Sequence, residues 1–260
     1  MQTFVYSYHG LVIESEYYLP ELITCQDPSA IEAQIRKVSE IEIFCPIVPG
    51  QRFYEISPSQ HFFQVEGIAK YMISGGREII IEEYNGVREE EIRAYLVSHV
   101  WNILINQLGK ILFHGCSLHI GPKVIFITGR SLYPRSILGQ ELEDKGFMLL
   151  SDSFSCIELI DDNPMVLSGI SPYRFKLDEI IFLQTTTQDH FVKRQLAGIE
   201  KVSTLLECIF YNELSKGQTI NNFDLASSLA KKCKFTKIEM PETNFTLEKL
   251  LDYFYQYHNS

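Results

Sequence analysis

The chain has 260 residues, of which 45% are hydrophobic, and its formal net charge is −10. This composition supports a sizeable buried core, while the acidic balance argues against nucleic-acid binding and leaves small molecules, peptides or proteins as partners. The sequence has neither an apolar run long enough to span a membrane nor the basic and apolar start of a secretion signal, so we expect a cytoplasmic protein.

The first 85 residues have the pattern of short strands. Apolar alternation predicts strands at 4–14, 40–44, 52–56 and 62–66, and a hairpin of 69–73 with 78–83 that turns at Ser74-Gly75-Gly76. The texture of the sequence changes near Asn85. We therefore expect an α/β protein with a β-rich N-terminal lobe at residues 1–85 and an α/β domain at 86–260.

The second part begins with a long amphipathic helix, predicted at 88–108 from apolar residues at helical spacing. Strands are predicted at 111–119, 123–128, 147–151, 155–159, 165–168 and 179–184. Helices are predicted at 201–214, 223–232 and 246–255. Six cysteines lie along the chain without any C-x-x-C pair, which favours reduced, buried thiols over a zinc site or a catalytic thiol.

Residues 113–158 have the outline of a phosphate-binding nucleotide site. A strand, the loop 129–136, a helical segment and a strand ending at Asp152 follow in the order that P-loop proteins use for phosphates and magnesium. Gly129 and Ser136 match the ends of the pattern G-x-x-x-x-G-K-[ST]. Pro134 replaces the second glycine and supplies no N–H, and Arg135 replaces the lysine with a planar guanidinium. A plain strand-turn-helix connection is the competing interpretation.

Several segments carry a family resemblance. They are YHGLVIESE at 8–16 followed by LPEL at 19–22, LFHGCS at 112–117, GFMLLSDS at 146–153 and CKFTKI at 233–238. In order and spacing they resemble the HPr-kinase-like serine kinases found with lasso-peptide biosynthesis genes. The resemblance implies an HPr-kinase-like P-loop core, ATP and magnesium as cofactors, and a serine of a precursor peptide as the acceptor.

The resemblance also implies the roles of individual residues. His114 and Asp152 match catalytic positions, although a lone strand histidine is as often structural. Gly129, Arg135 and Ser136 match the nucleotide-binding loop, and Ser136 with Asp152 would hold the magnesium ion.

The chain departs from the family pattern at three places. Pro134 and Arg135 change the loop, Ser153 stands where the second of two paired aspartates is expected, and the basic segment at 172–177 is short. Phosphoryl transfer depends on positioning and on cations that offset phosphate charge, so three changes in one site predict weakened or lost kinase chemistry.

Two functional hypotheses follow. The first is a kinase-derived protein that no longer transfers phosphate and binds a precursor peptide or a peptide-modifying enzyme. The second is an active ATP-dependent kinase of a precursor-peptide serine that uses a rearranged loop. A different ligand on the same scaffold is a third option, and the sequence leaves open whether the chain forms a homo-oligomer.

Overall fold

The computed structural model describes residues 2–25, 30–43, 48, 50–130, 135–169, 173–209, 219–242, 246, 248–252 and 254. The chain divides into two compact units. Unit 1 contains the described residues of Met1–Ile111 together with Thr219, and unit 2 contains those of Leu112–Gly169, Tyr173–Phe210 and Ile220–Ser260. This division follows Ile111 and therefore lies further along the chain than the boundary that the sequence suggested near Asn85.

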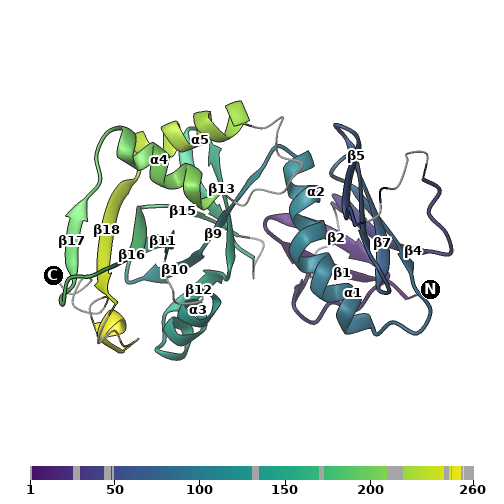
Figure 1. The fold of residues 1–260 in the computed structure, drawn as a ribbon, viewed down its shortest axis with the longest axis horizontal. Helices are drawn as coiled ribbons and strands as arrows, with labels where there is room; N and C mark the ends of the chain where they lie inside the picture. The colour runs from purple at the N-terminus through teal and green to yellow at the C-terminus, as the bar shows by residue number, and fades with distance from the viewer. Residues whose placement is uncertain are drawn as a thin grey trace. The chain divides into compact units, whose positions relative to one another are not determined.

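Unit 1 is built on an eight-stranded mixed sheet (Figure 1). In spatial order its strands are β3 (Ile23–Thr24), β1 (Phe4–Tyr8), β2 (Leu11–Ser15), β4 (Ala33–Val38), β8 (Glu78–Glu83), β7 (Ala69–Ser74), β6 (Gln60–Val65) and β5 (Phe53–Ser57). The β7–β8 hairpin and its turn are confirmed. Strand β4 pairs in parallel with both β2 and β8, so it joins two antiparallel halves into one sheet.

Two strand predictions in unit 1 were wrong. The predicted strand at 4–14 is a hairpin, because His9 and Gly10 both take positive φ angles, of 48° and 74°, and turn the chain between β1 and β2. Residues 40–43 of the predicted strand 40–44 are not in a strand, and β4 lies just before them. Paired polar and charged residues in β4 hid its alternation.

A continuous helical segment completes unit 1. It comprises α1 (Glu89–Tyr95), a π-helical turn (Leu96–Val100) and α2 (Trp101–Gln107), which confirms the predicted amphipathic helix. The hydroxyl of Tyr71 in β7 donates a hydrogen bond to the Ile92 carbonyl over 3.1 Å. The amide of Gln107 donates to the Ile73 carbonyl over 3.0 Å, and its Oε1 accepts from Gly76 N over 2.7 Å. The helix therefore belongs to the sheet that precedes it.

Unit 2 contains two sheets. The six-stranded sheet has the order β12 (Met148–Ser151), β10 (Cys116–Ile120), β11 (Lys123–Arg130), β16 (Glu179–Thr186), β18 (Lys234–Pro241) and β17 (Val192–Gln195). The four-stranded sheet has the order β15 (Arg174–Lys176), β14 (Asn163–Leu167), β13 (Phe154–Ile160) and β9 (Ile111–His114). Strands β11, β16 and β18 pair in parallel. The mixed α/β fold class is thus confirmed, with a strand-rich first unit.

Helices lie on both sides of the six-stranded sheet (Figure 1). On one side, Leu142 of α3 (Arg135–Asp144) packs with Ile125, Ile127 and Leu183, and Leu250 and Phe254 near the C-terminus join the same core. On the other side lie α4 (Ile199–Cys208) and α5 (Thr219–Lys232). None of the helices among the described residues is both long and apolar enough to span a bilayer.

Candidate functional site

The candidate site lies at one edge of the six-stranded sheet of unit 2. Strand β10 runs antiparallel to both β11 and β12, so β11 and β12 end at the same edge. Gly129 is the penultimate residue of β11, and Asp152 directly follows β12. His114 ends β9, just before β10 begins at this edge. The structure therefore brings together three of the five predicted site residues, and α3 lies against one of them, Asp152, at Gly139.

The sequence predicted one continuous strand at 111–119. This prediction was wrong, because the strand is interrupted, and the interruption shapes this edge. The strand is interrupted at Gly115, whose φ is 151°, and is thereby divided into β9 and β10. A Cβ at Gly115 would lie 2.2 Å from the Ile127 carbonyl oxygen. The glycine is therefore required for the close approach to β11, and it allows His114 and Cys116 to enter different sheets.

Gly129 has a structural role that a P-loop glycine does not need. It pairs with Leu183 in the parallel β11–β16 ladder, and its φ is 142°. A Cβ built on Gly129 would lie 1.9 Å from the Leu183 carbonyl oxygen and 2.6 Å from the Leu183 nitrogen. Close packing of two strands thus accounts for this glycine, as the strand-turn-helix interpretation expects.

Asp152 contacts the helix that follows the loop. A Cβ built on Gly139 of α3 would lie only 2.8 Å from Asp152 Oδ1, so the carboxyl group occupies the space that the missing side chain leaves. The residue as a whole is exposed, but this contact removes water from its carboxyl group. The resulting burial raises the pKa of Asp152, hydrogen bonds from Ser153 lower it less, and the acidic Glu143 raises it further.

Ser153, which stands where the second carboxylate is expected, is part of a tight turn. Ser153 has a φ of 60°, and Phe154 N donates to the Asp152 carbonyl over 2.5 Å across it. Ser153 N donates to Asp152 Oδ1 over 2.8 Å, and the Ser153 carbonyl accepts from Gly115 N over 3.0 Å. The main chain of this turn therefore donates a hydrogen bond to the Asp152 carboxyl group and accepts one from Gly115 at the β9–β10 break.

His114 is held by its backbone and by an aromatic neighbour. The Thr128 hydroxyl donates to the His114 carbonyl over 2.5 Å. The imidazole ring lies with its centroid 5.1 Å from that of Phe154, at an interplanar angle of 44°. These contacts explain the position of the ring by packing, and they leave the catalytic role as a prediction.

The remaining predicted site residues are described only in part. Helix α3 begins at Arg135, which confirms a helix directly after the loop and places Arg135 and Ser136 in its first turn. Their side chains, and all of residues 131–134, lie outside the described residues. The prediction that the loop forms no phosphate-binding nest falls on this part of the chain.

Two features of the edge escaped the sequence analysis. Gly139 carries no motif, and only the approach of Asp152 reveals its role. The hydroxyl groups of Ser117, Ser151 and Ser155 form a buried chain, with oxygens 2.7 Å apart for Ser117 and Ser155 and 2.6 Å apart for Ser151 and Ser155. Repeated serines at inward positions of neighbouring strands were the available signal. These hydroxyl groups link β10 and β12 of the six-stranded sheet to β13 of the four-stranded sheet, and Ser151 directly precedes Asp152.

The donor groups of the site limit what it can bind. Among the described residues, no group of three or more histidine, cysteine, aspartate or glutamate side chains is arranged to hold a metal ion. Magnesium is usually held by one or two carboxylates together with substrate phosphates. Asp152 would supply one carboxylate, and Glu143 of α3 is near enough to raise the Asp152 pKa, but the position of the expected second aspartate is occupied by Ser153.

Comparisons with known proteins give limited similarity. No protein-family model matches the sequence, and no curated protein matches it. Among solved structures, the chain is similar to the HPr(Ser) kinase/phosphatase from Coxiella burnetii, with 14% sequence identity and a TM-score of 0.34. The match covers 57% of this chain and 95% of that protein. Because the TM-score is so low, any functional argument rests on the residues of this chain.

Proposed function

We propose that this chain is a kinase-derived, HPr-kinase-like protein with an incomplete nucleotide site, which acts as a noncatalytic binding or accessory partner in the modification of a ribosomally made peptide. The family and the peptide setting come from the sequence resemblance. The observation that carries the loss of catalysis is the state of Asp152. This carboxylate stands at the expected edge, but its hydrogen bonds go to its own turn and its pKa is raised.

The charges around Asp152 support this proposal. A carboxylate that holds a magnesium ion is best kept ionised by nearby groups, whereas a raised pKa by itself would suit a general base. The charged residue that shifts the Asp152 pKa is Glu143, which is acidic and opposes ionisation. Ser153, at the second acidic position, takes part in the turn through its main chain. The edge therefore resembles a structural corner more than a prepared metal site.

The site still contains elements that favour the alternative of an active kinase. Asp152 and His114 lie at one edge of the sheet, and Asp152 contacts α3 at Gly139, which is compatible with a phosphoryl-transfer site. Arg135 begins the helix, and a guanidinium can bind phosphate oxygens through two parallel hydrogen bonds. A kinase of a precursor-peptide serine that uses a rearranged loop remains the second candidate.

Magnesium-ATP binding separates the two candidates. We expect calorimetry with unmodified protein to give no saturable heat up to about 1 mM magnesium-ATP, a concentration typical of weak binding. A variant with Pro134→Gly, Arg135→Lys and Ser153→Asp restores the loop and the acidic pair, and it should bind more tightly than the parent. The double variant without Ser153→Asp is the matched control and should gain less, because its magnesium ion would still lack the second carboxylate.

Phosphate transfer completes the test. Radiolabelled ATP is incubated with the protein and a serine-containing candidate precursor peptide, and the Asp152→Asn variant serves as the control. We expect no transfer above that control. Transfer by the unmodified protein that disappears in Asp152→Asn would overturn the noncatalytic function and establish the kinase alternative.

A further inference from the structure

Unit 1 has a cavity of about 420 Å³ that no part of the proposed nucleotide site uses. Its size falls within the range of ligand pockets. Its walls come from the first strand, the segment after β2, strands β4 and β8, and the start of α1. Distant parts of the chain therefore meet around one opening, and all of them belong to unit 1.

Aromatic rings form one side of this cavity. Phe4 and Tyr18 both line it, with ring centroids 5.5 Å apart and an interplanar angle of 59°. Tyr18 is 55% exposed, so part of its side chain is accessible to a ligand. An exposed ring beside a cavity offers its negatively polarised face to a cation.

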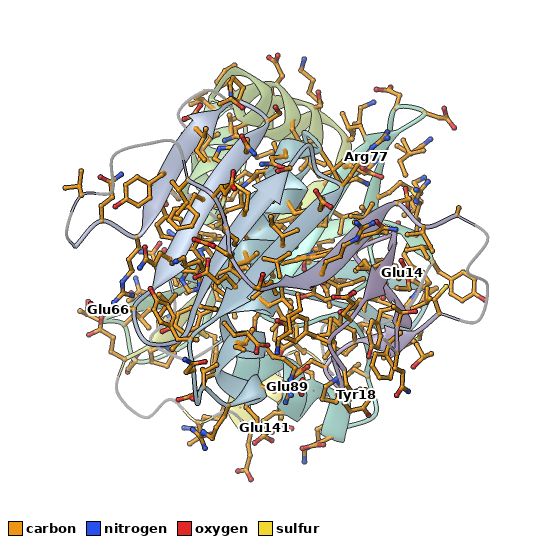
Figure 2. All side chains as sticks on the ribbon, turned by 90° about the vertical axis from the view of Figure 1, so that its right-hand side faces the viewer. Glu14, Tyr18, Glu66, Arg77, Glu89 and Glu141 are labelled. Carbon is orange, nitrogen blue, oxygen red and sulfur yellow. The ribbon has the colours of Figure 1, made fainter. Side chains whose placement is uncertain are left out.

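Acidic groups dominate the rest of the lining. Glu16, Glu83 and Glu89 line the cavity together with one basic residue, Lys37, which gives these four side chains a net charge of −2. Figure 2 labels Tyr18 and Glu89, which lie near each other at the lower part of the view. The whole of residues 1–111 is also acidic, with 15 aspartates and glutamates and 8 lysines and arginines. The potential in the cavity therefore favours a positively charged ligand.

Lys37 demonstrates how an ammonium group binds in this cavity. Its Nζ forms a short ion pair with Glu83 Oε2. The other oxygen of Glu83 accepts a hydrogen bond from the Tyr17 hydroxyl over 2.8 Å. Glu16 Oε2 accepts from the main-chain nitrogen of Lys37 over 2.7 Å. Glu89 is 56% exposed, and its Oε2 lies 3.9 Å from Arg93 Nη1. Glu83 is thus occupied from within the chain, Arg93 offsets part of the charge of Glu89, and Glu16 adds charge that Lys37 does not offset.

We propose that this cavity binds an arginine side chain of a peptide partner. A guanidinium can stack on an aromatic ring and donate to two carboxylates at once, which suits Tyr18 together with Glu16 and Glu89. The neighbouring Phe4 ring offers apolar contact to the residue beside the arginine. This inference deepens the proposed function, on which it rests only for the kind of partner, a peptide.

The first test uses a defined peptide. The probe is fluorescein-labelled Gly-Ala-Arg-Phe-Gly-Ala-amide, and the control is the same peptide with citrulline in place of arginine, which keeps the shape and removes the charge. Fluorescence anisotropy is measured with full-length protein tagged at the C-terminus, because Gln2 lines the cavity. We expect saturable binding of the arginine peptide and binding at least about fivefold weaker for the citrulline peptide, as loss of a cation–π contact and charge pairing implies.

Variants of the cavity locate the binding. The double variant Glu16→Gln with Glu89→Gln, and the single variant Tyr18→Ala, should each weaken binding at least about threefold. The matched controls are Glu90→Gln, an exposed neighbour in the same helix that does not line the cavity, and Tyr18→Phe, which keeps the ring. Both controls should bind as the parent does, and thermal unfolding checks that every variant is folded.

Lys37→Gln gives the sharpest result. Removing this cation frees one oxygen of Glu83 and makes the cavity more negative, so the arginine peptide should bind more tightly than to the parent. A purely structural role for Lys37 predicts unchanged or weaker binding.

Three outcomes would overturn the proposal. They are absence of binding, equal binding of the citrulline peptide, and displacement by free arginine amide at the same concentration as by the peptide, since the last would mean that the cavity takes a small cation. None of these outcomes depends on the magnesium-ATP experiment, so failure here leaves the noncatalytic proposal standing.

Discussion

Glu83 in unit 1 and Asp152 in unit 2 are carboxylates in opposite situations. Glu83 lies mostly buried, with the Tyr17 hydroxyl on one oxygen and the Lys37 ammonium on the other. The Asp152 carboxyl group accepts a hydrogen bond from Ser153 N in its own turn and lies against Gly139. The charged group that shifts the Asp152 pKa is Glu143, which is also acidic. The sequence drew attention to Asp152 and not to Glu83. The hydrogen-bond and ion-pair partners of a carboxylate, and not the motif in which it stands, therefore decide its state.

The largest expected effect tests whether the edge around Asp152 is a structural corner. Gly129→Ala would place a Cβ 1.9 Å from a main-chain oxygen of β16 at a φ of 142°. We expect it to reduce the free energy of unfolding by about 3 kcal/mol or more, measured by urea denaturation.

Gly139→Ala is the control for that prediction. Its Cβ would meet the end of the Asp152 side chain, which can move, and alanine favours the helix by up to about 1 kcal/mol. The free energy of unfolding should change by less than about 1 kcal/mol. Equal losses in the two variants would contradict the account of Gly129.

The next largest expected effect tests whether Glu83 stabilises the fold through Tyr17 and Lys37. Glu83→Ala leaves the buried Tyr17 hydroxyl without its carboxylate acceptor and separates Lys37 from its partner, so we expect a loss of about 1–3 kcal/mol in the free energy of unfolding. Glu83→Gln keeps an acceptor for Tyr17 and should lose less. If Glu83→Ala were as stable as the parent, the contrast with Asp152 would disappear.

The pH dependence of stability extends the comparison to a histidine of unit 1. Burial lowers the pKa of His61, whose Nδ1 lies 2.7 Å from Gln107 Nε2. Because the folded pKa lies below the ordinary value of 6.5, His61 contributes stability above pH 6.5 that is lost as the pH falls through the folded pKa. Urea denaturation should show a loss on the order of 1 kcal/mol over this range. His61→Gln should reduce this loss of stability.

The smallest expected effect concerns Asp152, whose contribution to stability changes with pH in the direction opposite to that of His61. Its raised folded pKa means that its favourable contribution is present below the unfolded value of 3.8 and is lost as the pH rises through the folded pKa. Asp152→Asn should therefore be neutral to slightly stabilising at pH 7, by less than about 1 kcal/mol because the residue is exposed. The difference between variant and parent, measured from pH 3 to 8, should shrink toward acid pH. A destabilised variant at pH 7 would indicate a cation partner for Asp152.

The sequence alone determined the elements whose signals are local. The β7–β8 hairpin follows from alternation and the Ser74-Gly75-Gly76 turn, and α3 follows directly after the β11 loop. The helix at 89–107 was evident from its apolar periodicity. Each of these depends on contacts within a few residues, which a pattern can express.

Tertiary structure decided what depends on distant partners. The parallel pairing of β4 with β2 and β8, and the assignment of the 89–107 helix to unit 1, required strands far apart in the chain to meet. The environment of Asp152 depends on Gly139 and that of Glu83 on Tyr17, 66 residues away. A pKa and an ion pair arise from desolvation and charge in three dimensions, so no spacing along the sequence could have assigned the two carboxylates their different states.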